Sequence, residues 1–223
     1  MTGNREDYIK VIYELGGERN RIATKDIAKA LEISPPSVSE MLKKLDKEDV
    51  LDYVVYRGVK LTQKGIDEAV RIKKVHILWE VFLVEKLGYD LADVHEEADL
   101  LEHITSKKLE KKLEEYLDYP DICPHGTPLN HDQYLFDYLP LNNALLGEVV
   151  SIKRLKDNKE FLKSIKDLNL IINNKYKVIN IKDGKYTLSN KEEIIKLSKK
   201  QAENIYIKKE NLWKNKLKLL VYC

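Results

Sequence analysis

The stretch "VHEEADLLEH", residues 94–103, places two histidines and four carboxylates in ten residues. On a helix with about 100° between residues, four of these side chains share one stripe: His95, Asp99, Glu102 and His103. Carboxylates crowded on one helix face repel one another unless a cation gathers them. The stretch therefore predicts either a set of metal ligands or an ordinary solvated acidic face.

Other segments carry residues of the same chemistry. His76 and Glu80 are spaced four residues apart and share a helix face, and a loop holds Cys123 and His125 two residues apart. Asp7 stands near the start of the first predicted helix. Carboxylate with imidazole suits Mn(II), Fe(II) or Co(II), whereas thiolate with imidazole favours zinc or iron. Each piece alone has a plain explanation as solvated charge, but their joint occurrence favours metal binding.

The segment before these residues is predicted to contain three helices followed by two short strands. Apolar spacing predicts helices over 5–15, over 24–31 with Thr24 as the cap, and from Pro35 onward with Ser34 as N-cap, followed by two short strands turning at Arg57-Gly58. Helix, turn, helix and hairpin make up the layout of a winged helix-turn-helix, in which the second helix of the pair enters the major groove. Residues 1–64 are therefore predicted to bind DNA.

The rest of the chain divides into a helical block and a β-rich end. A long helix is predicted from Lys64 to about Leu87, and further helices over 94–103 and 106–117. The broad apolar face of the long helix indicates a dimer interface, or else an internal core without a partner. Residues 119–130 are predicted as a loop, 131–144 as a linker, and the end as a small β-rich domain with a helix near 158–168 and a turn at Asp183-Gly184.

Composition limits the class of protein. The chain has 223 residues, of which 43% are hydrophobic and 34% charged, with a net charge of +2. Residues 90–123 carry 11 acidic and 4 basic side chains, while residues 124–223 carry 19 basic and 11 acidic ones. Without a long apolar run, a basic-then-apolar leader or paired cysteines, we expect a cytoplasmic protein with free thiols and no membrane partner.

Several segments together resemble the diphtheria toxin repressor family of metal-dependent transcriptional repressors. They are "EDYIKVIYEL", "TKDIAKAL", "ISPPSVSEMLKKL", "YRGVKLTQKG", "HEEADLLEH" and "DICPHGTP", and the match is close over about residues 4–130. The chain is most similar to the three-domain, manganese-responsive repressors of Gram-positive bacteria, because Asp7 stands where the iron-responsive branch has methionine. The resemblance implies a mainly α fold with a β-rich end: a winged helix-turn-helix (1–64), a helical metal-binding and dimerisation domain (65–140) and an SH3-like, FeoA-like domain with a C-terminal tail (141–223).

The resemblance also implies which residues act. One metal site would use Asp7, His76, Asp99, Glu102 and His103, and a second would use Glu80, Cys123, His125 and Glu160, with His95 as a ligand of the iron-responsive branch. Asp99 stands where cysteine or glutamate is usual, and Glu160 where close relatives carry aspartate. The residues implied to contact DNA are Thr24, Lys25, Ser34, Pro36, Ser37, Ser39, Glu40, Lys43 and Arg57.

The resulting hypothesis is a homodimeric repressor that binds operator DNA when loaded with metal and controls metal-ion uptake genes. The metal would be Mn(II) first, with Fe(II) as the alternative and Zn(II), Co(II) or Ni(II) as surrogates in vitro. Metal would join the first helix, through Asp7, to the Asp99–His103 segment and favour the DNA-binding arrangement. Two alternatives stay open: a metal-independent winged-helix regulator, and a dinuclear metal hydrolase, although no nucleophile or oxyanion arrangement accompanies the ligands.

Overall fold

The computed structural model describes residues 5–128, 138–190 and 193–210. The chain forms two compact units, one made of residues 1–79 and 99–113 and the other of residues 80–98 and 114–223. Among the described residues, no helix is both long and apolar enough to cross a membrane. The first unit is called the N-terminal unit below, and the second the C-terminal unit.

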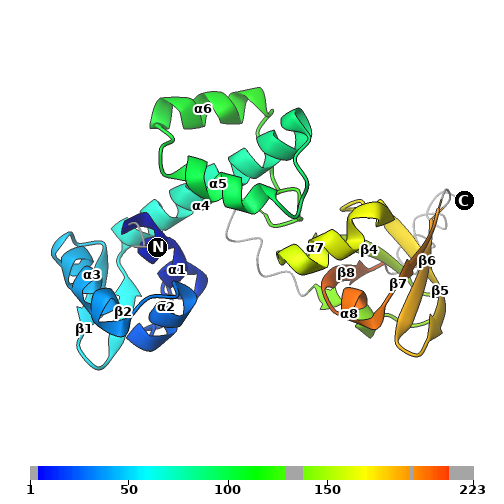
Figure 1. The fold of residues 1–223 in the computed structure, drawn as a ribbon, viewed down its shortest axis with the longest axis horizontal. Helices are drawn as coiled ribbons and strands as arrows, with labels where there is room; N and C mark the ends of the chain where they lie inside the picture. The colour runs from blue at the N-terminus through cyan, green and yellow to red at the C-terminus, as the bar shows by residue number, and fades with distance from the viewer. Residues whose placement is uncertain (1–4, 129–137, 191–192, 211–223) are drawn as a thin grey trace, which may run out of the picture. The chain divides into compact units, whose positions relative to one another are not determined.

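The N-terminal unit begins with the predicted winged helix-turn-helix (Figure 1). Its elements are α1 (Arg5–Glu14), α2 (Thr24–Ala30), α3 (Pro35–Lys47), β1 (Leu51–Val54) and β2 (Gly58–Leu61). Their apolar faces meet in one core, in which Ile9, Ile12, Ile27, Leu42 and Leu45 have no exposed surface. Burial of these side chains from three helices fixes the helices against one another.

The boundaries of α2 and α3 show how the turn between them is made. Ser34 is the N-cap of α3, with its side chain accepting from the Ser37 backbone N–H at 3.4 Å, and Pro35 is the first helical residue, as predicted. The expectation that Thr24 caps α2 is wrong. Ala23 is the N-cap, because its carbonyl accepts from Asp26 N at 3.0 Å, so Thr24 lies inside the helix.

The hairpin is antiparallel, with Leu51 opposite Leu61 and Val54 opposite Gly58. The turn occupies residues 55–57, one residue earlier than predicted, so Gly58 is the first residue of β2. Gly58 has φ +89°, and a Cβ there would lie 2.4 Å from the carbonyl oxygen of Ile22. Glycine is therefore required where the hairpin passes the chain before α2.

Three helices follow the hairpin: α4 (Gln63–Leu87), α5 (Val94–Glu102) and α6 (Lys107–Tyr116). All three match the prediction to within one residue at each end. Polar contacts fix the segment after α5 in the N-terminal unit. Arg71 of α4 donates to the Thr105 carbonyl and to Glu110, both at 2.9 Å, and Trp79 Nε1 donates to Thr105 Oγ1 at 2.8 Å.

The C-terminal unit is built on a six-stranded antiparallel sheet in the order β3-β8-β4-β5-β6-β7. The elements are β3 (Leu139–Pro140), η2 (Leu141–Asn143), β4 (Val149–Leu155), α7 (Lys159–Ile165), η3 (Lys166–Leu168), β5 (Lys175–Lys182), β6 (Lys185–Ser189), β7 (Ile194–Leu197), α8 (Lys199–Ala202) and β8 (Ile205–Lys209). Phe161, Leu162 and Ile165 of α7 pack into the core of this sheet. The predicted β-rich domain, its helix and its Asp183-Gly184 turn are all confirmed.

Two predicted segments fall partly or wholly outside the described residues. Of the expected linker over 131–144, the described part contains β3 and η2, so its second half is structured. The tail after residue 210 lies outside the described residues.

Candidate metal centres and DNA-contacting surface

One set of candidate ligands comes together within the N-terminal unit, from α1 and from the parts of α4 and α5 that belong to this unit. Asp7 comes from α1, His76 from α4, Asp99 and Glu102 from α5, and His103 directly follows α5. These five residues, called the first cluster, span almost a hundred positions of the sequence. Their grouping depends on the packing of α1, α4 and α5, which the sequence pattern alone does not state.

The first cluster consists of two overlapping triads that share Glu102. In one, His76 Nδ1 lies 2.6 Å from Glu102 Oε2 and 3.2 Å from Asp99 Oδ1. In the other, His103 Nε2 lies 2.9 Å from Asp7 Oδ1 and 3.7 Å from Glu102 Oε1. Within each triad the potential ligand atoms all lie within 4.8 Å of one another. The Glu102 side chain has no exposed surface, whereas 43% of the Asp99 side chain is exposed.

A lysine of α1 lies among the same carboxylates. Lys10 Nζ is 2.8 Å from Asp99 Oδ1, 2.9 Å from each carboxylate oxygen of Glu102, and 3.3 Å from His76 Nδ1. Burial of Lys10 opposes its positive charge, but the carboxylates of Glu102 and Asp99 outweigh that effect, so the pKa of Lys10 is raised. The triad of His76, Asp99 and Glu102 therefore holds an ammonium group.

His103 is held from two sides by the start of α1. Its Nδ1 lies 2.7 Å from Glu6 Oε2, while its Nε2 faces Asp7. Burial would lower the pKa of His103, but the hydrogen bond with Glu6 and the charges of Glu102 and Asp7 raise it overall. A carboxylate behind the imidazole is the arrangement that orients metal-binding histidines in proteins.

A second cluster lies in the C-terminal unit and joins Glu80 of α4 to Cys123 and His125 of the following loop. His125 Nδ1 lies 3.6 Å from Glu80 Oε1 and 3.8 Å from Cys123 Sγ, and all three residues are buried. Burial opposes protonation of this imidazole, but its contacts with Cys123 and Glu80 raise the pKa of His125 to about 11. A carboxylate, a thiol and an imidazole thus converge from two segments.

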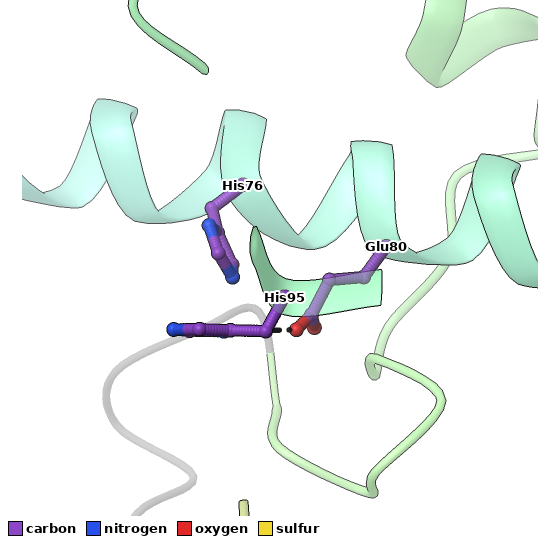
Figure 2. Close-up of side chains that lie close together, drawn as sticks. All are labelled: His76, Glu80 and His95. Atoms are coloured by element: carbon purple, nitrogen blue, oxygen red, sulfur yellow. Dashed lines mark hydrogen bonds and ion pairs between the residues drawn. The ribbon is translucent and has the colours of Figure 1, made fainter. Parts of the chain in front are cut away.

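His95 contacts Glu80, which is a member of the second cluster. Figure 2 shows His76 and Glu80 projecting from successive turns of α4, with the Glu80 carboxylate directed at His95. His95 Nδ1 lies 3.4 Å from Glu80 Oε1 and 3.2 Å from Asp157 Oδ2. The side chains predicted to share one face of α5 therefore have different partners. His95 contacts Glu80, whereas Asp99 and Glu102 contact His76.

Backbone hydrogen bonds shape the loop that carries Cys123 and His125. Cys123 N donates to the Thr127 carbonyl at 2.8 Å, and Thr127 N donates to Cys123 Sγ at 3.3 Å. His125 Nε2 donates to the Leu91 carbonyl at 3.1 Å, which leaves Nδ1 directed at Glu80 and Cys123. Fixing one ring nitrogen through a carbonyl is how proteins select the nitrogen that binds metal.

Glu160 stays a predicted ligand of the second site, and in this structure its side chain contacts Lys200. Its carboxylate pairs with Lys200 Nζ at 3.3 Å, and 81% of its side chain is exposed. Asp157 lies three residues earlier, in the connection between β4 and α7, and its carboxylate contacts His95. Asn158 caps α7 by accepting from Phe161 N, so Glu160 stands in the first turn of the helix while Asp157 precedes it.

Lys10, Glu6 and Asp157 were not singled out from the sequence. Lys10 follows Asp7 by three positions, so the two share a face of α1 and the spacing could have revealed it. Glu6 and Asp157 are ordinary surface acids in the sequence, and only their contacts with His103 and His95 give them a role.

Both clusters fit a divalent metal ion by the chemistry of their donors. The first offers carboxylate oxygens and imidazole nitrogens, the set that suits Mn(II) and Fe(II), and the second adds a thiol. Glu102, Glu80, His76 and His125 are each at most 5% exposed. Buried carboxylates and imidazoles in such groups are expected to bind a cation.

The residues expected to contact DNA lie on the surface of the winged helix-turn-helix. Lys25, Ser34, Pro36, Ser37, Glu40, Lys43 and Arg57 are exposed, and Thr24 and Ser39 are half-buried. Ser39 donates to the Pro35 carbonyl at 3.0 Å. Small polar groups at the start of α3, with lysines further along it, form a surface that suits base edges and phosphates.

Comparison with known proteins gives the same assignment over nearly the whole chain. Three family models match in succession: the iron dependent repressor N-terminal DNA binding domain (1–59), the iron dependent repressor metal binding and dimerisation domain (62–130) and the FeoA domain (139–209). The fold and these matches define a DNA-binding transcriptional regulator with a metal-binding and dimerisation domain.

Individual relatives cover different parts of the chain. An uncharacterized HTH-type transcriptional regulator of Methanocaldococcus jannaschii is 40% identical over 119 residues, which is 53% of this chain and 95% of that protein. The regulator MntR of Oceanobacillus iheyensis is 36% identical over 118 residues, 53% of this chain and 80% of the relative. The solved structure of the manganese regulator SloR is 37% identical in sequence and has a TM-score of 0.64. The match covers 94% of this chain and 100% of the SloR chain. The chain belongs to the diphtheria toxin repressor family of metal-dependent transcriptional regulators, which are DNA-binding proteins rather than enzymes.

Proposed function

We propose that this chain is a transcriptional repressor whose binding to operator DNA depends on a divalent metal ion, and that it controls genes for metal-ion uptake. The observation that carries the proposal is the contact between Asp7 of α1 and His103 at the end of α5, at 2.9 Å. A candidate ligand set that includes the first helix of the DNA-binding module gives metal a direct route to DNA affinity.

The metal proposed is Mn(II), with Fe(II) as the alternative. The first cluster contains only carboxylate and imidazole donors, which suit either ion. A solved relative is described as a manganese regulator, while the matching family models are described as iron dependent repressors. Zn(II), Co(II) and Ni(II) are proposed as surrogates in vitro, because affinity rises along the first-row series almost regardless of the site.

The proposed ligands follow the two clusters. The first site would use Asp7, His76, Asp99, Glu102 and His103. The second would use Glu80, Cys123, His125 and Glu160, with His95 beside it. Asp157 is a further candidate carboxylate from the β-rich domain because it contacts His95, whereas Glu160 pairs with Lys200 in this structure. A bound metal ion would supply a positive charge that gathers these donors.

We also propose that the chain acts as a homodimer, with the division into domains given by residues 1–64, 65–140 and 141–223. Apolar side chains near the end of α5 and in α6 support this: Leu100 is 68%, Ile104 77% and Leu109 44% exposed. Three exposed apolar side chains within ten positions of the sequence favour a contact with another protein surface. Sedimentation velocity on the full chain measures the association directly.

The experiment for the proposed function is a DNA-binding titration at fixed salt, since affinity for DNA depends strongly on salt. Duplexes are first selected from a randomised library in the presence of Mn(II). Binding is then followed by fluorescence anisotropy against graded free Mn(II), Fe(II), Co(II) and Zn(II). We expect tight binding with Mn(II) and at least about a tenfold loss with chelator, which corresponds to about 1.4 kcal/mol.

Two variants of α1 make the titration specific. Asp7→Ala removes a first-cluster carboxylate and is expected to uncouple DNA affinity from metal. Glu14→Ala removes an exposed acidic residue of the same helix and is expected to behave as the wild type. Equal binding of wild type with chelator and with metal would instead identify a metal-independent regulator.

A further inference from the structure

The side chain of Lys10 reaches from α1 into the first cluster and places its ammonium group among three candidate ligands. Its Nζ lies 2.8 Å from Asp99, 2.9 Å from both oxygens of Glu102 and 3.3 Å from His76. The ammonium group therefore contacts all three members of this candidate metal-binding triad. The contacts are made to the same atoms that would bind a metal ion.

These contacts lie largely away from water. Only 13% of the Lys10 side chain is exposed, and the Glu102 side chain has no exposed surface. In such surroundings an ion pair is poorly screened, and removing one partner leaves the other charge uncompensated. The ammonium therefore does for Glu102 what a metal ion would do, which is to balance a buried negative charge.

A divalent ion and the Lys10 ammonium cannot share this triad. First-row divalent ions bind oxygen and imidazole ligands at roughly 2.0–2.2 Å. An ion at that distance from Asp99, Glu102 and His76 would occupy the space that Nζ now fills, and two cations so close together would repel strongly. Binding in the triad therefore requires Lys10 to move out.

We propose that Lys10 is a built-in competitor for the metal in the first cluster, so that its displacement sets the metal concentration at which the repressor responds. The inference rests on the proposed function. Lys10 weakens metal binding by the free energy of its own ion pairs, and it keeps Glu102 and Asp99 paired when metal is scarce. It acts as a residue that determines affinity and not as a ligand.

The first test uses the wild-type chain and needs no variant. Amine acetylation by an N-hydroxysuccinimide ester is measured at each lysine by mass spectrometry, with chelator and with saturating Mn(II). We expect the reactivity of Lys10, relative to that of exposed Lys107 on α6, to rise at least about fivefold with Mn(II), because displacement exposes the amine. An ion pair of purely structural importance would stay protected, so an unchanged ratio would overturn the inference.

The second test measures Mn(II) affinity through the electron paramagnetic resonance signal of free Mn(II). It uses a Cys123→Ala background, which weakens the second cluster. Lys10→Met removes the charge while keeping a long apolar side chain, and it should tighten binding by about tenfold or more, or about 1.4 kcal/mol. Lys10→Arg retains a cation and should not tighten binding, and Lys107→Met serves as the matched control.

The outcomes separate this inference from the proposed function. Metal-dependent DNA binding by the wild type, together with unaltered affinity in Lys10→Met, would overturn only the role of Lys10. A wild-type chain that binds DNA equally with chelator and with Mn(II) would overturn both. Tighter Mn(II) binding by Lys10→Met, with DNA binding at lower free Mn(II) than in the wild type, would support both.

Discussion

Two carboxylates contact the same ammonium group at nearly the same distance but differ in burial. Lys10 Nζ lies 2.8 Å from Asp99 and 2.9 Å from Glu102, while 43% of the Asp99 side chain and none of the Glu102 side chain is exposed. The substitutions Asp99→Asn and Glu102→Gln remove one charge each and keep the shape. They therefore compare an exposed and a buried partner of one lysine.

Burial should decide the cost of each change. Breaking a buried pair by removing one partner costs about 3–5 kcal/mol, because it leaves a charge uncompensated. An exposed pair contributes only about 0–1 kcal/mol, since water screens it. Because Asp99 still balances part of the lysine charge, we expect Glu102→Gln to lower the free energy of unfolding by about 3 kcal/mol, near the low end of that range. Asp99→Asn should lower it by less than about 1 kcal/mol.

The assay is urea unfolding in the presence of a chelator, so that metal does not contribute. Trp79 lies in the N-terminal unit and donates to Thr105, so its fluorescence reports the unfolding of that unit. A Trp213→Phe background removes the second tryptophan. Equal slopes against urea in all variants would show that the comparison is one of stability alone.

A double-mutant cycle separates the ion pair from other effects of Glu102. Lys10→Met with Glu102→Gln should cost at least about 1 kcal/mol less than the sum of the two single changes, since each partner is then neutral. Equal costs for Asp99→Asn and Glu102→Gln would refute the argument from burial. Strict additivity in the cycle would refute the pairing itself.

Two further predictions concern the C-terminal unit. A Cβ at Gly126, which has φ +87°, would lie 2.1 Å from the Lys153 carbonyl oxygen. We therefore expect Gly126→Ala to lower the free energy of unfolding by about 1–3 kcal/mol in thermal unfolding and to weaken metal binding by the second cluster. Gly88→Ala is the control, because a Cβ at Gly88 meets no atom within 4 Å and should not affect that cluster. A backbone N–H and Lys209 lower the pKa of Glu148, so this carboxylate stabilises the fold above its ordinary pKa of about 4.5 and loses that effect as the pH falls below it. Acid titrations followed by circular dichroism should therefore show Glu148→Gln less stable than wild type by about 0.5–1 kcal/mol at neutral pH, with the two curves converging as acid protonates the carboxylate.

Much of the fold follows from local patterns. The α3 boundary was predictable because Ser34 and Pro35 determine it through their own backbone and side-chain chemistry. The ligand stripe on α5 was predictable because helical periodicity fixes which side chains share a face. Thr24 shows the limit of such reasoning, since the helix begins one residue earlier than the capping preference suggests.

Pairing across elements was harder to predict. Lys10 lies beside Glu102 because α1 packs near α5, and ninety-two positions separate the two residues. Asp157 rather than Glu160 contacts His95 because the cap at Asn158 places one acid before α7 and the other in its exposed first turn. A sequence pattern gives the ligand types, whereas tertiary packing decides which of them meet.

The role of α1 in metal response changes once both of its charged contacts are considered. Asp7 faces His103 in one triad of the first cluster, and Lys10 faces Glu102 and Asp99 in the other. Because Lys10 already links α1 to α5, a metal ion bridging Asp7 to α5 would replace an existing link rather than form the first one. The change in DNA affinity then depends on the difference in free energy between the arrangement linked by Lys10 and the arrangement linked by metal. Metal shifts this equilibrium only by as much as its affinities for the two arrangements differ. Weakening the lysine link should lower the metal concentration needed for DNA binding, and weakening the aspartate link should raise it.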